Sequence, residues 1–132
     1  MSRQAYIGLP VKDVERATEF FTRLGFAYKP EASDESTACL VVNDDTFVLL
    51  NAEPYFAEFT GSAVADTSAA REVTVGLSAD SREQVDDVVA RAVAAGGRAM
   101  GGPVERGLMY MQAFLDLDGH RWSVIHFDMP QG

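Results

Sequence analysis

Hydrophobic side chains near the start of the chain follow first a strand-like pattern and then a helical one. A short apolar run at residues 5–11 ends near Pro10, which suits a strand because a proline cannot continue a hydrogen-bonded ladder. Apolar residues then recur every three or four positions, which predicts a helix with one buried stripe. This stripe contains Val14, Ala17, Phe20, Phe21 and Leu24. Asp13 is placed to cap the start of the helix, and Gly25 is placed to end it.

The rest of the first half predicts a short strand and a hairpin. Residues 26–29 are expected to form a strand that leads away from the helix, and residues 30–36 are polar and turn-like. Two runs rich in β-forming residues follow at 37–42 and 46–50. The Asn-Asp-Asp segment between them favours a hairpin turn, since Asn and Asp side chains hydrogen-bond to nearby backbone groups.

The second half of the chain repeats this order. A strand is predicted at 72–77, and Ser81 with Gln84 fits the capping box that begins a helix. The buried stripe of this helix contains Val85, Val88, Val89 and Ala92. A Gly-Gly pair at 96–97 ends the helix. Further strands are predicted at residues 98–100, 108–115 and 120–127.

Both halves therefore share one plan of a strand, a helix and three strands, with an offset of roughly 70 residues. We expect an α+β fold in which two βαβββ modules form a pseudo-symmetric pair with curved mixed sheets around a cavity. The modules are expected at about residues 1–53 and 72–128. Residues 54–71 are expected to be a linker with a short helical turn at 54–59, and a lid that covers a ligand is the alternative.

Composition limits the classes of partner. The net charge is −9 and only 11 residues are Lys or Arg, which argues against nucleic acid. No apolar run approaches the length of a membrane span, so we expect no membrane partner and a cytoplasmic protein. Cys39 is the single cysteine and cannot form an intrachain disulfide. Its apolar neighbours favour a small buried hydrophobe over a reactive thiol.

Two motifs carry a resemblance to a known family. The Leu-Pro-Val-Lys-Asp-Val-Glu segment at 9–15, followed by Phe-Phe at 20–21 and Leu-Gly-Phe at 24–26, resembles the opening of the vicinal oxygen chelate superfamily. The Asp-Leu-Asp-Gly-His segment at 116–120 resembles its closing Asp-Pro-Asp-Gly turn, with Leu117 in place of proline. This superfamily includes glyoxalase I, bleomycin-resistance proteins and extradiol dioxygenases, and the chain is most similar to the glyoxalase-like, or lactoylglutathione-lyase-like, group. The resemblance implies a homodimer.

The same resemblance assigns four positions to metal ligands. Metal-dependent members use His, Glu or Gln from four strands, and counting from the motifs places these positions on Tyr6, Leu49, Thr74 and Ser123. None of the four residues is a ligand of that kind, so we expect neither a metal site nor a cofactor. His120 is expected to belong to the turn.

Other candidate chemical groups have simpler interpretations. His126 is expected to face the helix layer, because strand side chains alternate and Ser123 would then face the cavity. Asp116 and Asp118 could form an acid–base pair, but Gly119 follows them directly and favours turn residues.

Two functions fit these expectations. The first is metal-free binding of a small-molecule ligand in a mostly apolar cavity, as in drug-sequestering resistance proteins. The alternative is a lyase, isomerase or dioxygenase with a non-standard or metal-free site, for instance one that uses Tyr6 or Tyr110 as acid or base. A module whose dimer surface matters more than its pocket is a third possibility. The pocket candidates are Tyr6, Leu49, Phe56, Thr74, Tyr110, Gln112 and Ser123.

Overall fold

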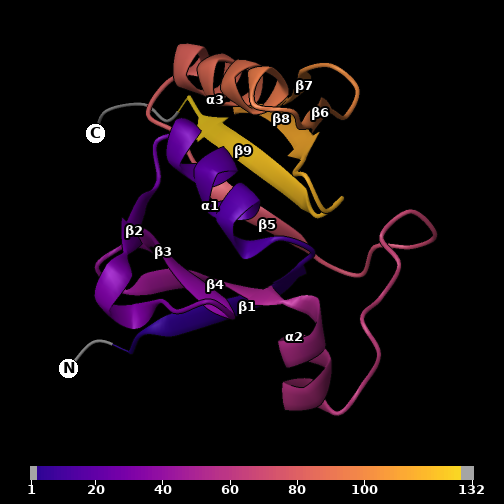
Figure 1. Cartoon of the computed structure of the whole chain (residues 1–132). Coiled ribbons are helices and arrows are strands. Elements are labelled where there is room, and N and C mark those ends of the chain that lie inside the picture. Colours follow the sequence, from indigo (N-terminus) through magenta and orange to yellow (C-terminus); the bar gives the residue numbers. More distant parts are fainter. Residues whose placement is uncertain (1–2, 129–132) are drawn as a thin grey trace. The chain divides into compact units, whose positions relative to one another are not determined.

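The computed structural model describes residues 3–128, which divide into two compact units. The first unit extends to Asp66 and the second begins at Thr67. Each unit contains one curved mixed sheet, and the chain has three α-helices in its described part (Figure 1). The α+β fold of two βαβββ modules that the sequence predicts is therefore confirmed.

The first unit forms a four-stranded sheet with the order β1-β4-β3-β2. Strand β1 is parallel to β4, and the other neighbours are antiparallel. The elements in chain order are β1 (Ala5–Val11), α1 (Val14–Arg23), β2 (Ala27–Lys29), the 3-10 turn η1 (Pro30–Ala32), β3 (Thr37–Asn43), β4 (Thr46–Ala52) and α2 (Glu53–Thr60).

The apolar stripe of α1 forms the core of this unit. The Asp13 side chain accepts a hydrogen bond from the backbone N–H of Arg16 over 3.0 Å, which caps the start of the helix as predicted. Phe20 and Phe21 are buried and contact each other edge to face. Helix α1 contacts β3 and β4, and the fully buried side chains of these strands are Leu40, Val48 and Leu50.

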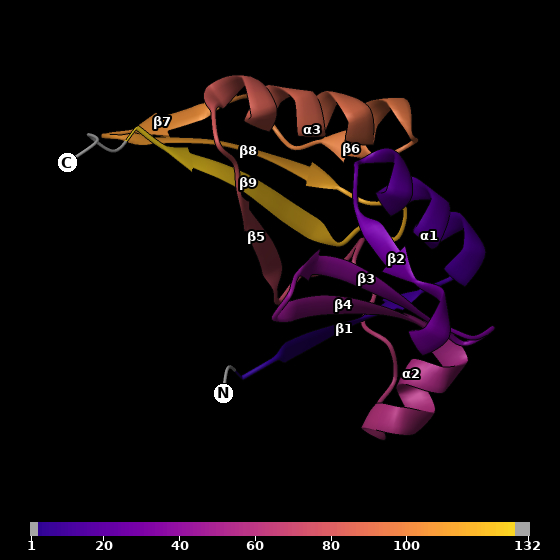
Figure 2. The ribbon, with the colours of Figure 1, turned by 90° about the vertical axis from the view of Figure 1, so that its left-hand side faces the viewer.

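The second unit repeats this topology. Its sheet has the order β5-β9-β8-β6, with β7 paired to β8, and β5 is parallel to β9. The elements are β5 (Thr74–Ser78), α3 (Arg82–Ala94), β6 (Arg98–Ala99), β7 (Val104–Arg106), β8 (Met109–Leu115) and β9 (Arg121–Phe127). Helix α3 lies along one face of the sheet formed by β8 and β9 (Figure 2).

The core of the second unit lies between α3 and this sheet. Trp122 and Phe114 are fully buried and stack in parallel with ring centroids 6.2 Å apart. Ser81 caps α3 by accepting the Gln84 N–H over 3.0 Å. The Gln84 side chain returns to the N–H of Asp80, one residue before the position that a capping box predicts.

Two segments add to the sequence prediction. Helix α2 covers the predicted helical turn at 54–59 and ends at Gly61, whose φ of 72° is left-handed. Strand β7 is an additional short strand that lies between β6 and β8 in the sequence and pairs with β8. No helix in the described part of the chain is long and apolar enough to cross a membrane.

Candidate functional site

Each sheet has one face turned away from its core helix, which is α1 in the first unit and α3 in the second. The first unit places three predicted pocket residues on or beside this face. Tyr6 is 58% exposed, and its ring stacks on Phe47 with centroids 5.2 Å apart. Leu49 follows two residues after Phe47 on β4, so it shares this face. Phe56 of α2 borders it, since a Cβ on Gly8 would lie 3.8 Å from the Phe56 ring. Gly8 pairs directly with Leu49.

The second unit brings two other predicted residues together. Thr74 of β5 and Ser123 of β9 face away from α3, and their hydroxyl oxygens are 3.3 Å apart. Arg121 is on the same face, because it precedes Ser123 by two positions on β9. Its Nη1 donates to Thr74 Oγ1 over 2.8 Å and to Ser123 Oγ over 2.7 Å. We call Thr74, Arg121 and Ser123 the Arg121 cluster.

Sequence reasoning missed Arg121. The residue directly follows the closing motif at 116–120 and does not match any position that the resemblance assigns to a ligand. The available signal was the period of two along β9, which places Arg121 beside Ser123 on one face. The sequence does not show that the guanidinium folds back onto a hydroxyl instead of extending into water.

The other two predicted pocket residues face α3. The Tyr110 hydroxyl donates to Asp86 Oδ1 over 2.5 Å, and the Gln112 amide donates to the same oxygen. The Arg82 guanidinium lies 4.9 Å from the centre of the Tyr110 ring. The structure therefore separates Tyr110 and Gln112 from Thr74 and Ser123 by the thickness of the sheet.

The Tyr110 phenol is held in its neutral form by these contacts. Its hydrogen bond to the Asp86 carboxylate, followed by burial, raises the pKa of Tyr110 above the ordinary value of 10.0. A phenol with a raised pKa is a poor general base at neutral pH.

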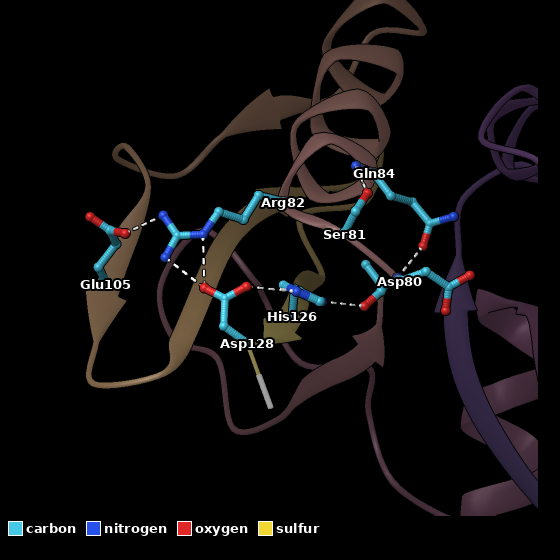
Figure 3. A network of polar contacts seen from close by, with 8 residues as sticks. Asp80, Ser81, Arg82, Gln84, Glu105, His126 and Asp128 are labelled. Atoms are coloured by element: carbon cyan, nitrogen blue, oxygen red, sulfur yellow. Dashed lines mark hydrogen bonds and ion pairs between the residues drawn. The ribbon is translucent and has the colours of Figure 1, made fainter. Parts of the chain in front are cut away.

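A second polar network lies at the start of α3 (Figure 3). Arg82 Nη2 donates to Asp128 Oδ2 over 2.8 Å, and Arg82 also pairs with Glu105. His126 places its Nε2 3.0 Å from Asp128 Oδ1 and its Nδ1 3.0 Å from the carbonyl oxygen of Ala79. Both nitrogens of His126 thus contact structural partners, and the ring faces the helix side as predicted.

The Asp116–Gly119 turn is held by the side chains of Asp116 and Thr67. Asp116 is 5% exposed, and its Oδ1 accepts the backbone N–H groups of Asp118 and His120 over 2.9 and 3.0 Å. The Thr67 hydroxyl donates to the carbonyl of Asp118 over 2.7 Å. These bonds confirm the prediction that Asp116 is a turn residue.

The residues at the four counted positions do not fit a divalent metal ion. Leu49 has no ligand atom, and the Tyr6 hydroxyl donates to the Gln4 side chain over 2.9 Å. The hydroxyls of Thr74 and Ser123 accept hydrogen bonds from a guanidinium cation, whose fixed positive charge opposes a second cation at the same oxygens. Within residues 3–128, no three His, Cys, Asp or Glu side chains gather closely enough to hold a metal.

A separate hollow of about 670 Å³ lies in the first unit, between α1 and the segment from Tyr28 to Ala38. Its lining includes Tyr28 and the carboxylates of Asp13, Glu15, Glu19, Asp34 and Glu35. Three of these carboxylates have local partners: Asp13 caps α1, Glu19 pairs with Arg23, and Asp34 accepts backbone N–H groups in its own loop. None of the predicted pocket residues lines this hollow.

Residues 3–124 match the model of the Glyoxalase/Bleomycin resistance protein/Dioxygenase superfamily. A search of curated proteins found no match. Among solved structures, hypothetical protein SA1046 from S. aureus is similar, with 25% identity, a TM-score of 0.82, and coverage of 96% of this chain and 95% of that chain.

Two other structures show the same fold. A glyoxalase-related enzyme from Fulvimarina pelagi is 20% identical, with a TM-score of 0.83 and coverage of 100% of this chain and 94% of that chain. A glyoxalase/bleomycin resistance protein/dioxygenase family enzyme from Burkholderia phytofirmans PsJN is 18% identical, with a TM-score of 0.82 and coverage of 96% of this chain and 99% of that chain.

Proposed function

Because the chain belongs to the glyoxalase/bleomycin resistance protein/dioxygenase superfamily, we propose that it is a member that binds a small molecule without a metal ion. The observation that carries this proposal is the Arg121 cluster. Two of the four positions that the resemblance assigns to metal ligands are hydroxyls, and both accept hydrogen bonds from one guanidinium. The guanidinium cation of Arg121 thus contacts both of these side chains, which favours binding without a metal ion.

The surface beside this cluster supports binding of a small organic molecule. Met111 and Ile125 are partly exposed on the same face as Ser123, and Phe127 at the end of β9 is 53% exposed. An apolar surface with a few convergent polar groups is typical of small-molecule sites. The second unit offers both features on the side of its sheet that faces away from α3.

The alternative, an enzyme that uses a phenol as acid or base, has less support. Tyr110 lies under α3 with its hydroxyl bonded to Asp86. Tyr6 lies on the open side of the first sheet, but its hydroxyl is bonded to Gln4. Asp116 is committed to its turn and to Trp122.

Metal content of the purified, untagged protein tests the proposal. We expect mass spectrometry to find far less than one metal per chain, and added nickel, zinc, manganese or iron(II) to leave the melting temperature unchanged. A metal that binds only the folded state would raise that temperature by mass action. Treatment with a chelator is expected to leave both stability and ligand binding unaltered. One tightly held metal per chain, with a raised melting temperature, would contradict the proposal.

A homodimer is the second part of the proposal. The resemblance implies it, and α2 carries exposed aromatic residues of the kind that are enriched at interfaces. Tyr55 and Phe59 stack with centroids 6.0 Å apart while 43% and 71% exposed. Sedimentation velocity should give twice the chain mass of 14.3 kDa. The Tyr55→Ser/Phe59→Ser double variant should shift the protein toward the monomer, and a wild-type monomer at all concentrations would contradict this part.

A further inference from the structure

The guanidinium of Arg121 has donors left over after its contacts within the protein. A guanidinium carries five N–H groups in a fixed planar fork. The contacts with Thr74 and Ser123 both use Nη1, which leaves Nε and the Nη2 group. Within residues 3–128, no carboxylate lies at ion-pair distance from Arg121, whereas Arg23, Arg82 and Arg91 each face at least one.

The two hydroxyls hold this guanidinium in place before any ligand arrives. Ser123 is 4% exposed, and its Oγ lies beneath Arg121 at 2.7 Å. Thr74 comes from β5, 47 residues away in the sequence, and its Oγ1 also lies 3.4 Å from the carbonyl oxygen of Arg121. An arginine that is already oriented loses less side-chain freedom when it binds an anion.

The sheet beside the cluster provides room and then apolar surface. Gly76 of β5 and Ala113 of β8 are the neighbours of Ser123 in the register, so the row that crosses the sheet at Ser123 consists of small side chains. The next row contains Ile125 and its partner Met111. A ligand group that contacts Arg121 could therefore continue along the sheet onto Ile125 and Met111.

We propose, on the basis of the proposed function, that the ligand is a small apolar molecule that carries a carboxylate. The Nε and Nη2 edge of Arg121 binds the two carboxylate oxygens as a bidentate pair, and the apolar body lies over Ile125 and Met111. A planar fork of two N–H donors matches the two coplanar oxygens of a carboxylate. Thr74 and Ser123 are positioning residues, because they orient Arg121 and do not contact the ligand in this arrangement.

The test compares three probes of similar shape on the full-length protein. Phenylacetate carries the carboxylate, phenylacetamide is its neutral counterpart, and phenethylamine is cationic. The buffer should be near physiological ionic strength, where the screening length of about 8 Å limits the effect of the net charge of −9. We expect phenylacetate alone to bind by calorimetry and to shift the NMR methyl signals of Ile125 and Met111.

Matched variants show which positive charge is responsible for phenylacetate binding. Arg121→Gln should weaken phenylacetate binding by about tenfold or more, as expected for loss of a charge-assisted hydrogen bond. Arg106→Gln removes the same charge from β7 at the other end of this sheet face, and should change the affinity by less than about twofold. Ser123→Ala leaves the charge in place but removes one hydroxyl that orients it, so a smaller loss of about threefold is expected.

Several results would overturn this inference. The first two are that phenylacetamide binds as tightly as phenylacetate, or that phenylacetate does not bind. The others are that inorganic phosphate binds more tightly than phenylacetate, or that the Arg121 and Arg106 variants lose equal affinity for phenylacetate. If Arg121→Gln does not fold, the inference is still tested by the three probes on the wild-type protein and by Arg121→Lys. The lysine keeps the positive charge but lacks the planar pair of N–H donors. A stoichiometric metal would contradict the proposed metal-free function. A metal-free protein that binds phenylacetamide more tightly than phenylacetate would contradict only the inference that the ligand carries a carboxylate.

Discussion

The Oδ2 of Asp116 accepts a hydrogen bond from the indole Nε1 of Trp122 over 3.0 Å. This bond joins the turn between β8 and β9 to the largest fully buried side chain of the second unit. The other oxygen, Oδ1, accepts the backbone N–H groups of Asp118 and His120. One buried carboxylate therefore accepts three hydrogen bonds, one from a buried indole and two from part-buried backbone N–H groups.

Removal of this carboxylate should destabilise the protein. Asp116→Ala removes the acceptor of the Trp122 N–H and of two backbone N–H groups, and loss of a buried hydrogen-bond partner costs about 1–3 kcal/mol. We expect a loss of about 3 kcal/mol in the free energy of unfolding by urea, and a smaller loss for Asp116→Asn, which keeps one acceptor oxygen. Asp87→Ala is the control, because its exposed ion pair with Arg91 contributes about 0.5 kcal/mol. Equal losses at both positions would contradict the role of Asp116.

Gly119 is required at the same turn for two reasons. Its φ is +81°, and an added Cβ would overlap the Thr67 hydroxyl that donates to Asp118. A left-handed conformation alone costs a non-glycine residue about 1–2 kcal/mol, so Gly119→Ala should lose at least that much stability. Gly102→Ala is the matched control, since a Cβ there meets no atom within 4 Å. It should be neutral or slightly stabilising, and a similar loss in both variants would contradict this account.

The ion pair between Arg82 and Asp128 should make stability depend on pH in the acid range. The hydrogen bonds from Arg82 lower the pKa of Asp128 below its ordinary value of 3.8. Because the folded state then binds fewer protons than the unfolded state, this contribution is present above pH 3.8 and is lost as the pH falls through the folded pKa. Both side chains are more than 40% exposed, so the effect is small.

A double-mutant cycle measures this contribution. The difference in urea midpoint between wild type and Asp128→Asn should be largest at neutral pH and should shrink toward pH 3. In an Arg82→Gln background, Asp128→Asn should change the midpoint much less, because the partner is already absent. An equal effect of Asp128→Asn in both backgrounds would show that Arg82 is not responsible.

The sequence predicted the elements well because periodicity reports directly on burial. The stripe of α1 and the alternation along β9 could be read without any contact between distant residues. Counting from the motifs also selected Thr74 and Ser123, which the structure places 3.3 Å apart. The predicted homodimer and the identity of the ligand stay predictions.

The side of the sheet on which β8 places its residues was harder to predict. Tyr110 and Gln112 share one face with each other, but the partner of Ser123 across the hairpin is Ala113. Only the register fixes this relationship, and register depends on how the 116–119 turn is closed. Arg121 was missed for a related reason, since one of its two hydroxyl partners comes from a strand 47 residues away.

The Tyr110 phenol provides a test that distinguishes the two faces of this sheet. The Asp86 carboxylate accepts its hydrogen bond, and this contact with burial raises the pKa of Tyr110 above 10.0. Since the folded pKa is raised, the stabilisation is fully present below the unfolded pKa and is lost as the pH rises through the folded pKa. Asp86→Asn should therefore lower the pKa of Tyr110, as followed by phenolate absorbance, whereas the neighbouring Asp87→Asn should not.

The same titration reports where a ligand binds. Saturation with phenylacetate should leave the ionisation of Tyr110 unchanged, because the proposed contact with Arg121 is on the opposite face from Asp86 and α3. Tyr110→Phe identifies its part of the absorbance change and serves as the control. A ligand-induced change in the Tyr110 titration that this variant abolishes would place the bound molecule on the α3 side, and would exclude the open face as its site.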